Sequence, residues 1–196
     1  MKTNSLPWRG GKHPPRRAAA LLAGAALLAV GAALGGRHLP YAGDRGHAAR
    51  LHYIVDGDTI HVRMQGRLEK VRLLGIDTPE MRDNPKARRD ARREGIPLSR
   101  LFRRGRAARD YLRRLLPRRA VLRIEPGRRP RDDYGRLLAY VFLPDGTLLN
   151  EAVLYAGWGD VMLWDEDTRY RHRLIAARDQ ARSAGRGLWG PAWNDE

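Results

Sequence analysis

The chain contains no cysteine among its 196 residues. That absence excludes a disulfide framework, a zinc site built on thiolates and a thiol nucleophile, and it is compatible with any compartment. No internal repeat is visible. The histidines show no metal-ligand spacing, and we interpret all six as surface or strand residues: His13, His38, His47, His52, His61 and His172.

Acidic residues are scarce in two segments. Residues 1–37 hold six Lys or Arg and no acid, and residues 82–119 hold fifteen basic and four acidic residues. The rest of the chain is nearly neutral, so these segments account for the formal net charge of +16. A generally Arg-rich proteome is one explanation. The concentration of charge in 82–119 favours the other, a polyanionic partner such as nucleic acid or an anionic membrane surface.

The sequence has one long apolar run, residues 18–34, and it carries no charge. A basic stretch followed by such a run predicts an export signal or a membrane anchor. We therefore divide this part into a basic tail (1–17), the anchor or signal segment (18–36) and a linker (37–49). The run exceeds the about 7–15 residues of a signal peptide. We favour an uncleaved anchor over a secreted, cleaved form, with the domain outside the cytoplasm in both cases.

The remaining chain, residues 50–190, predicts one domain, and residues 191–196 a short tail. Runs rich in β-branched and aromatic residues predict five strands, at 51–55, 59–64, 69–76, 120–126 and 136–143. Helical periodicity predicts three helices, at 99–117, 148–157 and 167–185, and the charged stretch 81–98 predicts a loop. This order predicts an α+β fold, a five-stranded OB-fold barrel with about three packed helices.

Carboxylates follow two of these strands. Asp58 closes the turn "DGD" at 56–58, and Asp77 and Glu80 lie in "GIDTPE" just after the third strand. If the strands are neighbours, these acids converge, and a hard cation such as Ca²⁺ or Mg²⁺ offsets their repulsion. The alternative is structural, because Asp-Gly and Asp-Thr-Pro are also common turn sequences.

Two arginines accompany these acids. Arg72 interrupts an otherwise apolar strand, and a strand arginine that points into a barrel needs an anionic partner. Arg136 follows "DDYG" at the start of the last predicted strand. A metal site flanked by guanidinium groups supplies what phosphodiester chemistry requires, since the cation and the planar forks hold phosphate oxygens and a free carboxylate activates water.

The motifs "DGDT" (56–59), "RLLGIDTPE" (72–80), "DDYGR" (132–136) and "GLWG" (187–190), in this order, closely resemble the staphylococcal-nuclease-like (thermonuclease) family. The resemblance covers roughly residues 50–190. It implies Ca²⁺-dependent hydrolysis of DNA and/or RNA that leaves 3′-phosphate ends. It also implies roles for individual residues: Asp58, Asp77 and Thr78 as metal ligands, Glu80 as general base, and Arg72 and Arg136 as phosphate clamps. Asp56 is either a turn residue or a support for this set.

The chain departs from the family in two places. The Arg-rich segment lengthens the stretch between Glu80 and Arg136, and it is either a nucleic-acid contact, a solvated helix face or a lipid contact. The tyrosines that stack a base in the family have no counterpart in "GWGDVMLWDED" (157–167), where Trp158 or Trp164 would stack or pack in the core. The candidate nucleic-acid patch is Arg100, Arg103, Arg104, Arg106 and Trp164.

Two other functions compete with a nuclease. One is a catalytically inactive OB-fold module that binds nucleic acid, and the other is a basic protein of the membrane surface that uses residues 18–36 as its anchor. The complete set of acids and arginines favours the nuclease over both. No protein partner is inferable, and the sequence does not distinguish DNA from RNA or endonuclease from exonuclease action.

Overall fold

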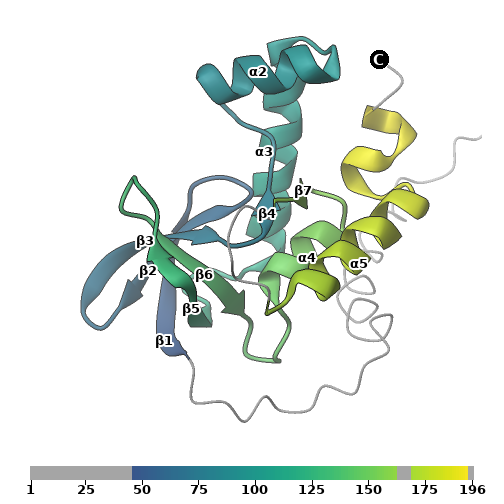
Figure 1. Cartoon of the computed structure of the whole chain (residues 1–196). Coiled ribbons are helices and arrows are strands. Elements are labelled where there is room, and N and C mark those ends of the chain that lie inside the picture. Colours follow the sequence, from purple (N-terminus) through teal and green to yellow (C-terminus); the bar gives the residue numbers. More distant parts are fainter. Residues whose placement is uncertain (1–45, 163–168, 194–196) are drawn as a thin grey trace, which may run out of the picture. The chain divides into compact units, whose positions relative to one another are not determined.

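The computed structural model describes residues 46–162 and 169–193. Five strands form a closed barrel in the order β1–β2–β3–β6–β5 (Figure 1). Neighbouring strands are antiparallel except β3 and β6, which run parallel. The predicted five-stranded barrel is confirmed. Its strands are β1 (His47–Ile54), β2 (Thr59–Met64), β3 (Arg67–Leu73), β5 (Val121–Arg131) and β6 (Leu137–Phe142).

The barrel core follows from the pattern of the strands. In β2 the apolar residues Ile60 and Val62 are fully buried. Arg63, which lies between Val62 and the buried Met64, is exposed. The sequence LLAYVF of β6 is buried at every position, as expected of a strand covered on both faces. Figure 1 shows helices α4 (Leu149–Tyr155) and α5 (Arg171–Ser183) beside each other at one side of this strand.

The parallel contact between β3 and β6 matters most for the site. Arg72 lies opposite Leu138, and Val71 lies opposite Leu137. Arg136, one residue before β6, is thereby brought to the end of the barrel at which β3 finishes. Directly beyond β3 the chain forms β4 (Ile76–Asp77). This strand pairs with β7 (Asp160–Val161) in a separate two-stranded sheet.

The three predicted helices are present as α3 (Leu98–Leu115), α4 and α5, and two short 3-10 turns follow at Gly187–Trp189 and Pro191–Trp193. The prediction of a loop over 81–98 is wrong, because Pro85–Glu94 forms a further helix, α2. The described part of the chain thus has four α-helices, not about three. In Figure 1, α2 crosses the end of α3 that lies away from the barrel.

Helix α2 is built from local signals rather than from a large apolar face. Its first turn is closed by Asn84, whose side-chain oxygen accepts a hydrogen bond from the Ala87 N–H at 2.8 Å, and Pro85 occupies the first helical position. Gly95 ends it in the left-handed conformation at φ 66°. Ala87 and Ala91 pack on Leu101 of α3, a small cluster separate from the barrel core.

Strand β1 begins at His47, so the barrel starts three residues earlier than the expected domain boundary at residue 50. The predicted anchor or signal segment, residues 18–36, lies outside the described residues. Within the described ranges, none of the helices has the length and apolar character needed to cross a membrane.

Candidate active site

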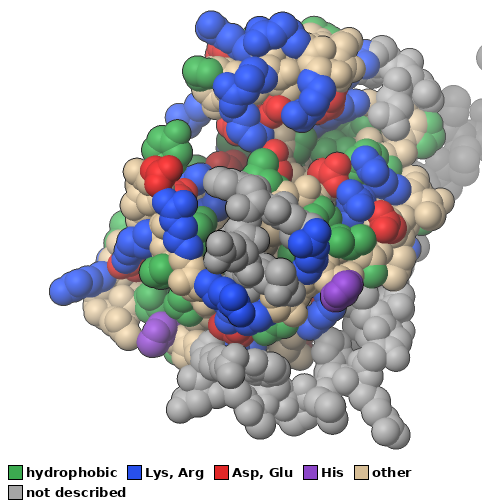
Figure 2. All heavy atoms as spheres, in the orientation of Figure 1, with side chains coloured by type: hydrophobic (Ala, Val, Ile, Leu, Met, Phe, Trp, Pro, Cys, Tyr) green, Lys and Arg blue, Asp and Glu red, His purple; other side chains and the backbone are tan. Residues whose placement is uncertain are grey.

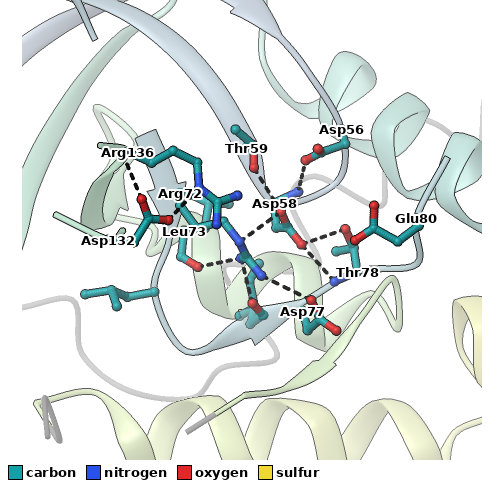
Figure 3. A network of polar contacts seen from close by, with 12 residues as sticks. Asp56, Asp58, Thr59, Arg72, Leu73, Asp77, Thr78, Glu80, Asp132 and Arg136 are labelled. Atoms are coloured by element: carbon teal, nitrogen blue, oxygen red, sulfur yellow. Dashed lines mark hydrogen bonds and ion pairs between the residues drawn. The ribbon is translucent and has the colours of Figure 1, made fainter. Parts of the chain in front are cut away.

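Asp58 lies in the turn between β1 and β2, and its side chain is buried at the mouth of the barrel (Figure 3). One carboxylate oxygen accepts hydrogen bonds from the backbone N–H and the hydroxyl of Thr78, both at 2.9 Å. The other accepts from the Thr59 hydroxyl at 3.1 Å. Burial alone raises the pKa of Asp58, but the charge of Arg72 and the bonds from Thr78 bring it below its usual value. Asp58 is therefore held as a carboxylate.

The preceding acid in this turn has a different role. Asp56 accepts a hydrogen bond from the backbone N–H of Asp58 at 3.1 Å, as expected of an aspartate that shapes its own turn. Burial and the neighbouring Asp58 charge raise the pKa of Asp56 to about 7. The geometry thus favours a turn role for Asp56, through which it also supports the position of Asp58.

Arg72 is the centre of the arrangement, and its side chain is buried. Its guanidinium lies 3.3 Å from Asp58 and 3.1 Å from Asp77, measured between the closest nitrogen and oxygen atoms. It also donates to the carbonyls of Leu73 and Ile76, at 3.0 and 2.7 Å. A planar guanidinium with this many partners has little rotational freedom, so Arg72 fixes the two acids relative to each other.

Asp77, Thr78 and Glu80 lie on one loop that glycines allow to pack tightly. A Cβ added to Gly105 of α3 would lie 2.5 Å from the Pro79 carbonyl oxygen, and one added to Gly57 would lie 2.7 Å from the Thr78 hydroxyl. Both distances are shorter than van der Waals contact. Helix α3 and the β1–β2 turn therefore clamp this loop from two sides, and the clamp sets the position of Glu80.

Lys86 of α2 places a positive charge among three carboxylates. Its ammonium lies 2.9 Å from Asp77, 3.4 Å from Glu80 and 2.8 Å from Asp90. Burial lowers the pKa of Lys86, but Asp77 and Asp90 outweigh that and raise it above the ordinary value. Burial raises the pKa of Asp77 despite this contact. The second oxygen of Glu80 accepts a hydrogen bond from the Asn84 amide at 2.9 Å.

Arg136 reaches the same end of the barrel from β6, on the other side of Arg72 from Glu80 (Figure 3). Its Nε donates to Asp132 at 2.6 Å, and its guanidinium lies 5.6 Å from the centre of the Tyr134 ring, which is almost fully exposed. Burial alone would raise the pKa of Asp132, but the bonds from Arg136 lower it. Arg136 is thus oriented by an acid and remains partly open to solvent.

The oxygen donors of the site suit a hard divalent cation, since Asp58 and Asp77 supply carboxylates and Thr78 supplies a carbonyl. In the described ranges, no three Asp, Glu or His side chains have metal-binding spacing as they stand. The Lys86 ammonium supplies the positive charge that a metal ion would otherwise supply, because three carboxylates already converge on it. The donors of Asp58, Asp77 and Thr78 therefore fit a divalent cation, provided that the Lys86 ammonium moves away from Asp77.

The predicted nucleic-acid patch is only partly a surface. Arg104 is buried, and its guanidinium binds Glu94 at 2.7 Å and the Trp193 carbonyl at 2.5 Å, so its assignment to the patch is wrong. Arg103 and Arg106 are exposed on α3, and they line a hollow together with the half-buried Arg100. Figure 2 shows Lys and Arg side chains gathered on the face formed by α2 and α3.

The two candidate stacking tryptophans differ. Trp158 is half-buried and packs between Tyr111 and Trp193, with ring centres 6.2 and 6.1 Å away. Trp164 lies outside the described residues.

Sequence reasoning missed Lys86, Asn84, Asp90 and the orienting role of Asp132. The signal for the first three was present, because Asn-Pro is a helix-start sequence that would have placed Lys86 in a first turn beside Glu80. Asp132 was inside a quoted motif, "DDYGR", but its carboxylate was assigned no partner.

The model of the family described as "Staphylococcal nuclease homologue" matches residues 70–191. The chain belongs to this family. Among curated relatives, it is 30% identical to a protein named "Thermonuclease" from Staphylococcus intermedius, over 74% of this chain and 77% of that one. A second "Thermonuclease", from Staphylococcus hyicus, is 29% identical over 69% and 72% of the two chains. "Endonuclease YhcR" of Bacillus subtilis is 29% identical over 69% of this chain but 11% of its own length.

Membership in the staphylococcal nuclease family agrees with the closed barrel, which carries Asp58, Arg72 and Arg136 at one rim. The match also extends through α2 and α3, the region in which this chain has its Arg-rich segment. Lys86 and Gly105 therefore lie within the family domain rather than in an appended part.

Proposed function

We propose that the chain is a metal-dependent nuclease that hydrolyses phosphodiester bonds of DNA and/or RNA and leaves 3′-phosphate ends. The observation that carries this proposal is the position of Arg72, which is buried between Asp58 and Asp77 on the same rim as Glu80 and Arg136. A barrel needs no such buried network for its stability, because apolar residues of similar volume would serve as well. The free-energy cost of burying these charges is explained if the network binds an anionic ligand.

Ca²⁺ is the cation that we propose for the site, held by Asp58, Asp77 and the Thr78 carbonyl. When bound, it would supply positive charge to a non-bridging phosphate oxygen. The guanidinium groups of Arg72 and Arg136 bind further phosphate oxygens through paired N–H donors. Asp132 keeps the Arg136 fork in one orientation, so less freedom is lost when phosphate binds.

Glu80 is the proposed general base. Its carboxylate takes a proton from water, the water oxygen forms a bond to phosphorus, and the bond from phosphorus to the 5′ oxygen breaks. The 5′ oxygen leaves and acquires a proton from solvent, and the 3′ oxygen keeps the phosphate. Arg136 offsets the negative charge that develops on the leaving side. Asn84 and Lys86, which now bind Glu80, hold its carboxylate towards the rim.

We further propose that the domain acts outside the cytoplasm, because the basic tail and apolar segment of residues 1–36 have the pattern of an anchor or export signal. An anchor at residues 18–36 would keep the nuclease at the membrane. Cleavage after it would release the domain.

The test compares the whole chain, in mild detergent, with Glu80→Gln on single-stranded DNA, duplex DNA and RNA. We expect cleavage with Ca²⁺ that chelator abolishes, and a loss of about 10²–10⁴-fold in the variant, which is the usual contribution of a general base. Glu69→Gln is the control, since Glu69 binds Arg131 on the outside of the barrel. Binding without cleavage in the unmodified chain would favour the inactive OB-fold module instead.

A further inference from the structure

Two adjoining hollows lie between β1 and the loop that follows α3. Their volumes are about 520 and 380 Å³, and they share Leu51, His52 and Arg119. We call their union the basic groove, because its lining includes five arginines and no acidic residue: Arg50, Arg63, Arg113, Arg118 and Arg119. Of these, Arg113 pairs with Asp110 at 3.3 Å. The groove is distinct from the rim that carries Arg72.

The first sign that the groove binds a polyanion is a pair of like charges. Arg50 of β1 and Arg63 of β2 lie directly opposite each other, and both are exposed. Like charges in that arrangement destabilise a sheet. Among the residues that the structure describes, neither arginine has an ion pair or hydrogen bond through its side chain. An anion between them would remove the repulsion.

The second sign is the backbone at Arg119, which adopts a left-handed conformation with φ 60°. It is the third residue of a turn closed by a 3.0 Å hydrogen bond from the Ala120 N–H to the Pro117 carbonyl. Glycine is the residue that suits this position, and an L-residue there costs about 1–2 kcal/mol. The arginine is thus unfavourable for folding, and it lines both hollows of the groove.

The third sign is an exposed aromatic ring. The pairing of β1 with β2 is irregular between Leu51 and Tyr53, and such bulges redirect side chains. Tyr53 is 48% exposed and packs edge-on against His61 with ring centres 5.7 Å apart. An open aromatic ring beside arginines suits a base that stacks while its phosphates bind the cations.

We propose that the basic groove is a second, non-catalytic binding site for single-stranded nucleic acid. Tyr53 favours an unpaired polynucleotide, because duplex DNA presents no base face to stack. The concave shape of the groove favours nucleic acid over a phospholipid surface, since a hollow contacts a single strand better than it contacts a flat bilayer. The proposal rests on the proposed function only in taking nucleic acid as the polyanion.

The groove lies where a bound strand would continue from the rim. Gly57, in the turn that carries Asp58, packs against Ala108 of α3, where an added Cβ would be 2.8 Å from the Ala108 Cβ. Arg113 lies about 7–8 Å further along the same helix, at a rise of about 1.5 Å per residue. The backbone N–H of Leu51 bonds the Ala120 carbonyl at 2.8 Å and ties the loop to β1.

The test measures binding of oligothymidylates to the whole chain in chelator, as a function of salt. Lengths of about 4 and about 16 nucleotides bracket the site size of an OB-fold. In Arg50→Gln/Arg63→Gln/Arg119→Gly, we expect the salt slope for the longer strand to fall by about 2, at about 0.7 per lost phosphate contact. Binding of the shorter strand, and its cleavage with Ca²⁺, stay unchanged.

Arg119→Gly is also measured alone, and Arg171→Gln is its single-charge control, because Arg171 is exposed on α5, away from the groove lining. The groove variants should also unfold at equal or higher urea concentration than the unmodified chain, since they remove repulsion and backbone strain. A loss of stability would assign these arginines to the fold and overturn the proposal.

Two other outcomes would overturn it. One is an unchanged salt slope for the longer strand. The other is weaker binding to vesicles of phosphatidylserine and phosphatidylcholine with oligothymidylate binding unaffected, which would assign the groove to a membrane. Neither outcome bears on the proposed nuclease activity, which is tested by cleavage of the short strand. Conversely, a groove-dependent slope in a chain that cleaves nothing would remove the nuclease and keep the groove.

Discussion

The candidate site is made from two regions of opposite character. The barrel rim holds Asp58 and Arg72, both buried, with hydrogen bonds to neighbouring backbone and hydroxyl groups. Helix α2 supplies Lys86, whose partners are other charged side chains and whose side chain is 30% exposed. The rim is therefore fixed by the fold, whereas the contribution of α2 is an exchangeable charge. A cation held by Asp58 and Asp77 would displace Lys86 from Asp77, whereas it would share both carboxylates with the fixed Arg72.

The largest effect should come from removing the buried arginine of the rim. Arg72→Met leaves Asp58 buried without its countercharge, so we expect the free energy of unfolding to fall by about 3–5 kcal/mol in urea titrations. Arg136→Met is the comparison, because Arg136 is partly exposed and its loss should cost less than about 1 kcal/mol. Equal losses would mean that the buried arginine of the rim contributes no more to stability than the partly exposed one.

The next effect tests the clamp between α3 and the Glu80 loop. Gly105→Ala improves helix propensity, but its methyl group would meet the Pro79 carbonyl, so we expect a net loss of about 1–3 kcal/mol. The cleavage rate should fall by more than the loss of folded protein explains, because Glu80 shifts with the loop. Arg114→Ala, at an exposed position of the same helix outside the candidate nucleic-acid patch, serves as the control. A more stable Gly105→Ala protein would show that no clamp exists.

A smaller effect belongs to the start of α2. Asn84→Ala removes the cap and the bond to Glu80, and helix caps contribute about 1 kcal/mol. Hydrogen exchange of the α2 amides should quicken while that of the barrel stays unchanged. Asn84→Asp keeps the cap but repels Glu80, so it should preserve protection of α2 and lower activity. Faster exchange in the barrel as well would contradict the separation of the two regions.

The smallest effect concerns the exchangeable charge itself. Lys86→Met leaves the carboxylates of Asp77, Glu80 and Asp90 without their ammonium, so Ca²⁺ should bind several-fold more tightly in calorimetric titrations. Lys70→Met, at an exposed position of β3, should leave the affinity unchanged. Weaker Ca²⁺ binding in Lys86→Met would mean that the lysine orders the acids and does not compete with the metal.

The rim was predictable from the sequence because its signals are local and unusual. An arginine inside an apolar strand, and acids directly after strand ends, indicate one end of a barrel before the strands are paired. The parallel β3–β6 contact confirms that Arg72 and the start of β6 meet. Burial of Arg104 was not predictable in the same way, since one arginine in a run of arginines has no distinguishing neighbour.

Helix α2 was missed because its sequence, PKARRDARRE, has little apolar content for a periodicity to reveal. Its stability depends on Asn84, on Gly95 and on two alanines against Leu101, and alanine is a weak burial signal. The Asn-Pro helix start was visible in the sequence, but the contacts of Lys86 depend on where α2 lies, so the meeting of three carboxylates at its ammonium was not derivable. These acids are separated along the chain, and only the crossing of α2 over α3 brings them to one ammonium.

The parallel contact between β3 and β6 also bears on how the protein matures. Val71 and Leu137 are far apart in the chain, and contacts of that kind form slowly because a long loop must close first. A nascent chain that ends before β6 already contains Asp58, Arg72 and Glu80, but it lacks Arg136 and cannot close its barrel. Pairing of β6 with β3 is therefore the step that brings Arg136 to the end of the barrel at which Arg72 lies.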